Sequence, residues 1–260
     1  KSWAAGDATS RAVRLADMSL RGEMGIPGVL TAPQWGFYDV SFSKTNKDQQ
    51  LKSLEDREFK FTQNYGTYVM ENVLFMTSFP AEFHAQTAAE AAVTLHPQVK
   101  DRLDQIEKIV IRTHESAIRI ISKVGPLAAV PLAFGNLVAE HYEDDFHAAN
   151  PIIDELREKM EIVEDERFTR EYLEADKRSI ANAIQVFFQD GTSTEEVSVE
   201  YPIGHRRRRE EGIPLLEKKF KANLATRFPS ARSQHIFDLC KNQSELEQTA
   251  IHRFMDLFVI

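Results

Sequence analysis

The stretch from Ser78 to Gln86 (Ser-Phe-Pro-Ala-Glu-Phe-His-Ala-Gln) places a carboxylate, an imidazole and an amide at the start of an otherwise apolar segment. Glu82 and His84 are residue types that carry protons in general acid–base catalysis, and apolar surroundings shift the pKa of such groups. In a regular helix Glu82 and Gln86 share a face, whereas His84 lies about 200° from Glu82 around the axis. Both catalytic candidates therefore reach one pocket only if the first turn is irregular. The alternative is a first-turn acid beside a structural core histidine.

A second candidate site lies at the beginning of the sequence. Lys1 precedes Gly-Asp-Ala-Thr-Ser-Arg (6 to 11) at the predicted start of a helix, where free backbone amides and the helix dipole attract anions. Ser10 adds a hydrogen-bond donor and Arg11 adds a positive charge, so this segment could hold a carboxylate. An ordinary helix capped by Asp7, with exposed cations, is the alternative.

Two further polar segments follow predicted strands. Arg-Thr-His-Glu (112 to 115) closes a strand and exposes His114 to a possible ligand, although a plain polar strand exit explains it as well. Gly204-His205 opens a run of four arginines, 206 to 209. Such a run alone suggests a polyanion, but no aromatic residue interleaves it, and this favours a solvated or intersubunit salt-bridge segment.

The best grouping of metal-ligand types comprises His141, Glu143, Asp144, Asp145 and His147. These residues lie in an acidic, loop-like stretch whose spacing matches no metal-binding motif. We therefore predict that the chain holds no metal.

Periodicity predicts the elements that must position these groups. A helical stripe runs through 8–24, capped by Asp7 and ended by Gly25 to Pro27, and a second helix spans 81–95 with Pro80 in its first turn. A β-branched run at 108–113 predicts a strand.

The middle of the chain carries a hairpin pattern, and its end is helical. Residues 184–189 and 196–201 flank Asp190-Gly191, a pair that favours a tight turn between strands. Helical spacing returns after Gly204 and again in a last segment, 244–257. The predicted order is helical, then mixed α/β, then helical.

Composition narrows the classes of function. Forty-two per cent of the 260 residues are hydrophobic, enough for a sizeable core, and the net charge of −8 argues against a general nucleic-acid or acidic-membrane binder. Cys240 is the single cysteine, which excludes a disulfide framework, a cysteine zinc site and an iron–sulfur cluster held by this chain. No run approaches the roughly 20 apolar residues of a membrane span. The first residues carry no signal-peptide pattern and suggest a start inside a longer chain.

Several longer stretches, read together, resemble the MmgE/PrpD family in its tricarboxylate dehydratase branch. They are Trp-Ala-Ala-Gly-Asp-Ala-Thr-Ser-Arg (3 to 11), Leu-Thr-Ala-Pro-Gln-Trp-Gly-Phe-Tyr-Asp-Val-Ser-Phe (30 to 42), Tyr-Val-Met-Glu-Asn-Val-Leu-Phe (68 to 75), Ser-Phe-Pro-Ala-Glu-Phe-His-Ala-Gln-Thr-Ala (78 to 88), Ile-Arg-Thr-His-Glu (111 to 115), Val-Glu-Tyr-Pro-Ile-Gly-His (199 to 205) and Asp-Leu-Phe-Val-Ile (256 to 260). The likeness runs essentially from end to end.

The resemblance implies a mostly α-helical fold with a smaller α/β lid domain. Residues 1–67 would end the large helical domain, with a polar surface insertion at 43–58, residues 68–204 would form the lid, and residues 205–260 would return to the helical domain. The family's N-terminal helical half, and a stretch between Leu127 and Ala128, would be missing from this chain.

The implied activity is that of a cofactor-independent lyase. It would dehydrate 2-methylcitrate to 2-methyl-cis-aconitate in propionate catabolism, the methylcitrate cycle. Two alternatives stay open, namely a cis-aconitate decarboxylase-like lyase and an inactive interaction fragment. The partners would be a small tricarboxylate and a second copy of the chain in a homodimer, with neither nucleic acid nor membrane. The compartment would be the cytoplasm in a bacterium or the mitochondrial matrix in a fungus.

The resemblance also assigns roles to residues. Lys1 matches a family active-site lysine and, with Glu82 and His84, is expected to be catalytic. Decarboxylase relatives carry a histidine at the position of Glu82. The residues expected to bind substrate are Asp7, Ser10, Arg11, Gln86, His114 and His205.

Overall fold

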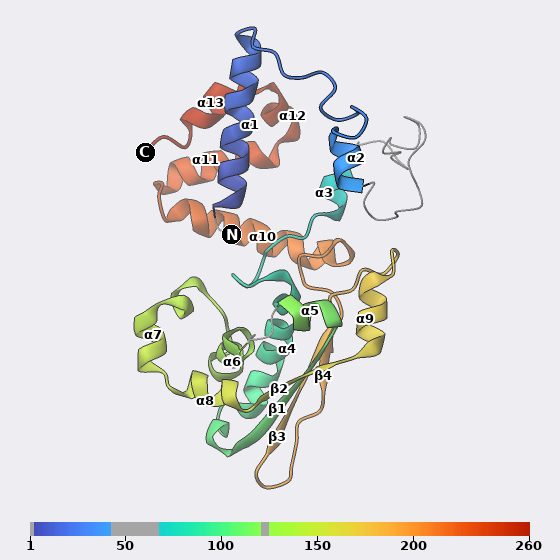
Figure 1. Cartoon of the computed structure of the whole chain (residues 1–260). Helices are drawn as coiled ribbons and strands as arrows, with labels where there is room; N and C mark the ends of the chain where they lie inside the picture. The colour runs from blue at the N-terminus through green and yellow to red at the C-terminus, as the bar shows by residue number, and fades with distance from the viewer. Residues whose placement is uncertain (1–2, 43–67, 121–124) are drawn as a thin grey trace. The chain divides into compact units, whose positions relative to one another are not determined.

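The computed structural model describes residues 3–42, 68–120 and 125–260 (Figure 1). The chain divides into two compact units, Lys1–Gly66 and Thr67–Ile260. The predicted polar insertion at 43–58 lies outside the described residues. Within the described part of the chain, no helix combines the length and the apolar character needed to cross a membrane.

Unit 1 contains the helix predicted near the beginning of the chain, but its start differs from the prediction. Helix α1 spans Ala4–Leu20 with Trp3 as the N-cap, so the expected cap at Asp7 is wrong. Asp7 lies instead in the first turn, where its carboxylate accepts a hydrogen bond from Arg11 Nε at 3.1 Å. The helix ends before the expected Gly25, and Gly22 follows in a left-handed conformation, φ 94°. The other described helix of this unit is α2, Phe37–Phe42.

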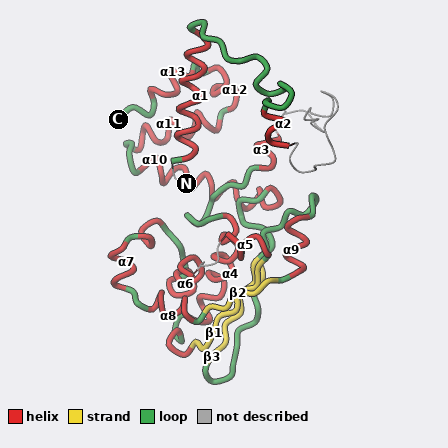
Figure 2. The backbone as a smooth tube through the Cα atoms, viewed as in Figure 1, coloured by secondary structure: helices red, strands yellow, loops and turns green. Residues whose placement is uncertain are grey.

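Unit 2 combines helices with one small sheet (Figure 2). Its elements before the last helices are α3 Tyr68–Asn72, α4 Phe83–Val99, η3 Leu103–Gln105, β1 Ile106–Thr113, α5 Glu115–Ile120, α6 Gly125–Phe134, η4 Ala139–Tyr142, α7 Asp144–Ala149, α8 Ile152–Glu158, β2 Met160–Glu164, α9 Glu166–Leu173, β3 Asn182–Phe188 and β4 Val197–Val199. The stretch around His141 to His147 is therefore helical, not the loop expected from its acidic composition.

The sheet has the order β2-β1-β3-β4. Strands β1 and β2 are parallel and are joined by a helical crossover, while β3 is antiparallel to both β1 and β4. The predicted hairpin is confirmed, since β3 and β4 pair across a turn in which Gly191 adopts φ 81°. In the register, Thr113 faces Asn182 and Asn182 faces Val199, so the last residue of β1, the first of β3 and the last of β4 share one edge of the sheet.

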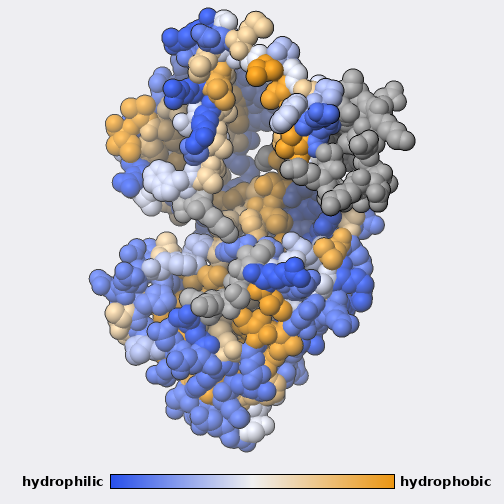
Figure 3. Space-filling view, viewed as in Figure 1, coloured by the Kyte–Doolittle hydropathy of each residue, from blue (hydrophilic) through white to orange (hydrophobic). Residues whose placement is uncertain are grey.

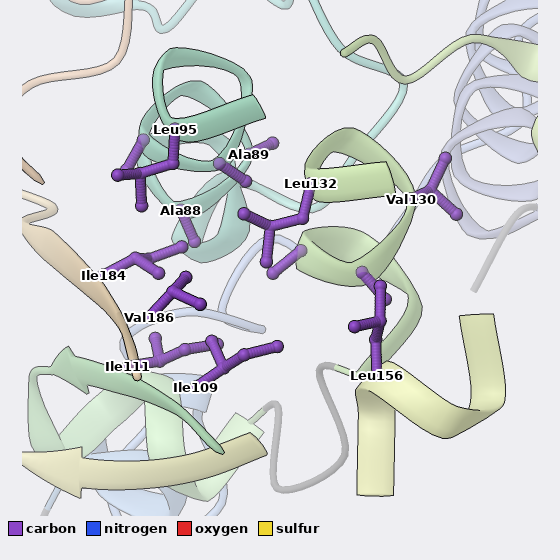
Figure 4. Close-up of a cluster of buried hydrophobic side chains, with 14 of the residues drawn as sticks. Ala88, Ala89, Leu95, Ile109, Ile111, Val130, Leu132, Leu156, Ile184 and Val186 are labelled. Carbon is purple, nitrogen blue, oxygen red and sulfur yellow. The ribbon is translucent and has the colours of Figure 1, made fainter. Parts of the chain in front are cut away.

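The main core lies between this sheet and helices α4, α6 and α8. Alternate residues of β1 and β3, including Ile109, Ile111, Ile184 and Val186, face the alanine-rich side of α4 (Figure 4). Ala183 points to the opposite face, where it packs with Phe168 of α9 and Ala181. The polar ends of the sheet are thus held between α4 on one side and α9 on the other.

The C-terminal residues are helical, as predicted. Helix η5 Arg206–Arg208 leads into α10 Arg209–Ala225, α11 Ser230–Lys241, α12 Gln243–Gln248 and α13 Ile251–Asp256. Leu224, Ile236 and Phe237 form a separate small hydrophobic cluster there. The last predicted segment consists of two short helices because Thr249 takes an extended conformation, ψ 118°.

Hydrophilic side chains cover most of the visible surface around the sheet (Figure 3). The mostly helical composition and the small mixed sheet confirm the predicted fold class.

Candidate active site around Glu82 and His84

Helix α4 begins two residues later than expected, and this changes the geometry of the candidate site. Glu82 is the N-cap, with φ −58° and ψ 146°, and its Oε2 accepts a hydrogen bond from the backbone amide of His84 at 2.8 Å. Pro80 therefore precedes the helix and does not occupy its first turn. Because Glu82 is extended, the separation of about 200° that holds inside a regular helix does not apply.

The side chains of Glu82 and His84 meet as a result. Oε1 of Glu82 lies 2.8 Å from Nδ1 of His84. The carboxylate is 44% exposed and the imidazole 13% exposed, so the pair has one side towards solvent and one towards the core. A carboxylate at this position fixes the orientation of the imidazole.

Two aromatic rings from other elements complete the cluster. The Tyr172 hydroxyl of α9 lies 3.4 Å from Nε2 of His84. The Tyr172 ring stacks on His114, with centroids 4.3 Å apart and planes 13° apart, and the His84 and His114 rings lie 5.2 Å apart. Residues from α4, from the end of β1 and from α9 thus converge at one edge of the sheet.

His114 is fully buried and is neutral at pH 7. Burial, followed by the neighbouring His84, lowers the pKa of His114 to about 4, although Glu82 opposes this shift. Its Nδ1 accepts a hydrogen bond from the Ala117 amide at 3.3 Å, which assigns the proton to Nε2. That Nε2 has no hydrogen-bond partner among the described residues. His114 can therefore donate a hydrogen bond but carries no positive charge for a carboxylate.

A small cavity of about 10 Å³ lies behind this cluster. It has room for about one water molecule. Its lining residues are His84, Ala88, Ile111, Thr113, Ala117, Ile162 and Asn182. A tricarboxylate is too large for this space, so a ligand of that size could contact the Glu82–His84 pair only from its exposed side.

Polar side chains inside the fold fix the start of α4. Asn182 Nδ2 donates to the His84 carbonyl at 2.8 Å and to Thr87 Oγ1 at 2.7 Å. Gln86 is buried, and its Nε2 donates to the carbonyls of Phe79 and Ala81. Both hydrogens of the Gln86 amide thus hold the extended segment before the helix, and the expectation that Gln86 binds substrate stays a prediction.

The other predicted site residues belong to unit 1 or to another part of unit 2. Lys1 is outside the described residues, and Asp7, Ser10 and Arg11 lie on α1 in unit 1, where Asp7 and Arg11 form an exposed ion pair. His205 is buried in unit 2 and stacks on Tyr201, with centroids 4.5 Å apart. Its Nδ1 accepts a hydrogen bond from the Arg207 amide at 3.2 Å. Burial and then Arg206, Arg207 and Arg209 lower the pKa of His205 to about 4.

The four arginines after His205 bind within the chain. Arg208 forms ion pairs with Glu90 and Glu211, both at 2.8 Å, and Arg209 donates to the Val73 carbonyl while its guanidinium lies 3.9 Å from the centroid of the Phe75 ring. Arg207 donates to the Asp176 carbonyl, and Arg206 donates to Asn72. Most of these donors therefore tie the segment to neighbouring parts of unit 2, while Arg206 and Arg207 are also exposed to solvent, and an intersubunit role stays a prediction.

Sequence reasoning missed Tyr172 and Asn182, which lie 88 and 98 residues from His84. No local pattern marks either residue. Over 3–42, 68–120 and 125–260, no group of His, Cys, Asp or Glu side chains has the arrangement of a metal site.

The family comparison agrees with this architecture. A family model described as the MmgE/PrpD C-terminal domain matches residues 79–243, and one described as the MmgE/PrpD N-terminal domain matches residues 1–50. The chain belongs to the MmgE/PrpD family, which confirms the resemblance seen in the sequence motifs.

Individual relatives are similar over the whole chain. The 2-methylcitrate dehydratase of Escherichia coli K12 is 52% identical over 276 residues, covering 100% of this chain and 54% of the relative. The enzyme of that name from Cupriavidus necator is 50% identical, covering 100% and 54%. The mitochondrial 2-methylcitrate dehydratase of Yarrowia lipolytica is also 50% identical, covering 100% and 50%. The chain spans about half the length of the curated relatives it matches.

Proposed function

We propose that the protein containing this chain dehydrates 2-methylcitrate to 2-methyl-cis-aconitate in propionate catabolism. The observation that carries this proposal is the contact between Glu82 and His84 in a chain at least 50% identical, over its full length, to relatives named 2-methylcitrate dehydratase. A hydrogen-bonded carboxylate and imidazole with one exposed side form a general acid–base pair, which this elimination needs.

The proposed reaction is a β-elimination. The Glu82–His84 pair takes the proton from the carbon next to a carboxylate, and the electron pair of that C–H bond is held as an aci-carboxylate. The carbon–carbon double bond then forms as the C–O bond on the adjacent carbon breaks, and the leaving hydroxyl takes a proton from a protonated side chain of the site and departs as water. If the imidazole receives the first proton, Glu82 stabilises the imidazolium that results.

The remaining site residues also have proposed roles. By the resemblance, Lys1 stabilises charge that develops on the substrate, and Asp7, Ser10 and Arg11 belong to a carboxylate-binding segment of α1. The enclosed, neutral His114 orients Tyr172 against His84 and does not pair with a carboxylate. His205 remains a proposed substrate ligand as a neutral donor.

A turnover assay on the natural full-length protein tests the proposal. Incubation with 2-methylcitrate should produce the ultraviolet absorbance of a double bond conjugated to a carboxylate. Addition of EDTA should leave the rate unchanged, because the proposed steps use protein side chains alone. Release of carbon dioxide from cis-aconitate, without dehydration of 2-methylcitrate, would replace this function with the decarboxylase alternative, and no turnover of either compound would favour an inactive protein.

We also propose that the protein is a homodimer, as the resemblance implies, and light scattering after gel filtration tests this. Its compartment would be the bacterial cytoplasm or the fungal mitochondrial matrix, which cell fractionation of the source organism decides. The proposed lid at 68–204 and C-terminal segment at 205–260 have support in two separate hydrophobic clusters, one centred on the sheet and one on α10 and α11.

A further inference from the structure

A second pocket in unit 2 is large enough for a small molecule. It has a volume of about 390 Å³, within the range of about 300–1,000 Å³ that ligand sites occupy. It is formed by the end of α3, the loop after α9 and the segment around η5. Its lining residues are Asn72, Leu74, Ala175, Arg178, His205 and Arg206.

The arginines of this pocket carry positive charge that no carboxylate neutralises in the described part of the chain. Arg178 has no ion pair or side-chain hydrogen bond there, and Arg206 donates to the neutral amide oxygen of Asn72 at 3.0 Å. By contrast, Arg208 of the same run is neutralised by Glu90 and Glu211. The pocket therefore presents two guanidinium groups, and no acidic side chain is among its described lining residues.

The backbone at Arg178 adopts a conformation that is unfavourable for its residue type. Its φ is 47°, in the left-handed region that residues other than glycine and asparagine rarely enter. The Arg178 amide bonds the Glu174 carbonyl at 2.9 Å, and Ile180 bonds Glu200 at 3.1 Å, so the turn is held from both sides. Such strained residues cluster at ligand sites, where the surrounding fold sustains them.

His205 adds a neutral hydrogen-bond donor to the same wall. Because Nδ1 accepts the Arg207 amide, the proton of the neutral ring is on Nε2. No described residue accepts a hydrogen bond from this Nε2. The low pKa of His205, caused by burial and by three nearby arginines, is consistent with a positive local field.

The pocket lies near the same edge of the sheet as the Glu82–His84 pair. His114 follows β1, Asn182 begins β3, and Tyr201 and His205 follow β4 at the edge where these strands are in register. Arg178 follows α9, the helix that provides Tyr172.

We propose that this pocket binds a small polycarboxylate, with Arg178 and Arg206 each binding a carboxylate and with Leu74 and Ala175 contacting the carbon skeleton. Planar guanidinium groups match carboxylates through paired hydrogen bonds. The volume and the two apolar residues favour an organic anion over inorganic phosphate. If the proposed function holds, this ligand is 2-methylcitrate. This identification of the ligand rests on the proposed function.

Calorimetric titration of the 260-residue chain with tricarballylate, an unreactive tricarboxylate, tests the pocket directly. Arg178→Gln and Arg206→Gln should each weaken binding by at least about tenfold, the usual effect of losing a charge-assisted contact. Arg227→Gln is the matched control, because Arg227 is exposed and has no ion pair among the described residues, and its affinity should equal that of the unchanged chain. Inorganic phosphate should bind at least about tenfold more weakly than tricarballylate.

Each contrary outcome is distinct. No binding by the unchanged chain, or equal affinities in all three variants, would overturn the pocket. Phosphate binding as tightly as tricarballylate would overturn the ligand class. Tricarballylate binding with no turnover of 2-methylcitrate by the full-length protein would remove the proposed function and leave the pocket. Turnover of 2-methylcitrate with a KM that Arg178→Gln leaves unchanged would keep the proposed function and remove the pocket as its substrate site.

Discussion

Glu82 Oε1 lies 2.8 Å from His84 Nδ1, although these residues stand two apart at the start of a helix. The contact exists because Glu82 is the N-cap and not part of the helix. One carboxylate therefore caps the helix through Oε2 and orients the imidazole through Oε1. The two side chains form one unit, and their effects on catalysis should be coupled.

The first prediction is a non-additive pair of substitutions. In the full-length protein, Glu82→Gln and His84→Asn should each lower kcat by at least about 100-fold, and the double variant should fall by less than about tenfold beyond the worse single variant. Glutamine keeps an oxygen for the His84 amide, so the thermal melt of Glu82→Gln should stay close to that of the unchanged protein. Additive losses would show that the two groups act independently, and normal turnover in both single variants would remove the pair from the site.

The second prediction concerns the tight approach of two backbone segments at Gly204. A Cβ built at Gly204 would lie 1.6 Å from the Phe75 carbonyl oxygen. The backbone amide of Phe75 also donates a hydrogen bond to the Gly204 carbonyl at 3.0 Å. Gly204→Ala should lower the free energy of unfolding by more than about 2 kcal/mol, because neither backbone segment can move without losing this contact. Gly6→Ala is the control, since nothing lies within 4 Å of its Cβ position and α1 should gain up to about 1 kcal/mol. Equal denaturation midpoints for both variants would contradict the close approach.

The third prediction is that the folded chain loses stability in acid because His114 becomes protonated. The folded pKa of about 4 lies below the ordinary value of 6.5, so between these values the unfolded chain binds a proton that the folded chain does not. The stabilising contribution is complete above pH 6.5 and is lost as the pH falls towards 4, by up to roughly 3 kcal/mol for this buried group.

Denaturation midpoints measured from pH 4 to pH 7 check this prediction. The midpoint of His114→Gln should change less with pH across this window than that of the unchanged chain. His252 is exposed, so His252→Gln should keep the original slope of midpoint against pH. His205, with a similar lowered pKa, should keep part of the slope in the His114 variant. An unchanged slope in His114→Gln would show that His114 is not held neutral.

Local patterns predicted the elements better than the contacts between them. Asp190-Gly191 defined the hairpin because the turn conformation belongs to the two residues themselves. The predicted first residues of α1 and α4 were wrong because Trp3 and Glu82 occupy the N-caps, and neither is a preferred capping residue. Glu82 and His84 could be chosen as candidate site residues because their side chain types carry protons. Tyr172 joins them only through the packing of α9 against the sheet, and no spacing in a single sequence encodes that packing.

The last prediction separates strain from binding at Arg178. Its φ of 47° is unfavourable for arginine but accessible to glycine. Arg178→Gly should therefore raise the free energy of unfolding, by up to about 1 kcal/mol after the greater flexibility of glycine in the unfolded chain is subtracted. The same variant should weaken tricarballylate binding by at least about tenfold, because the guanidinium is gone. Arg178→Gln keeps the strained backbone, so it should lose the affinity without gaining the stability. Thermal melts and calorimetric titrations of the two variants decide the matter: a glycine variant that binds as tightly as the unchanged chain would mean that this arginine does not hold the ligand.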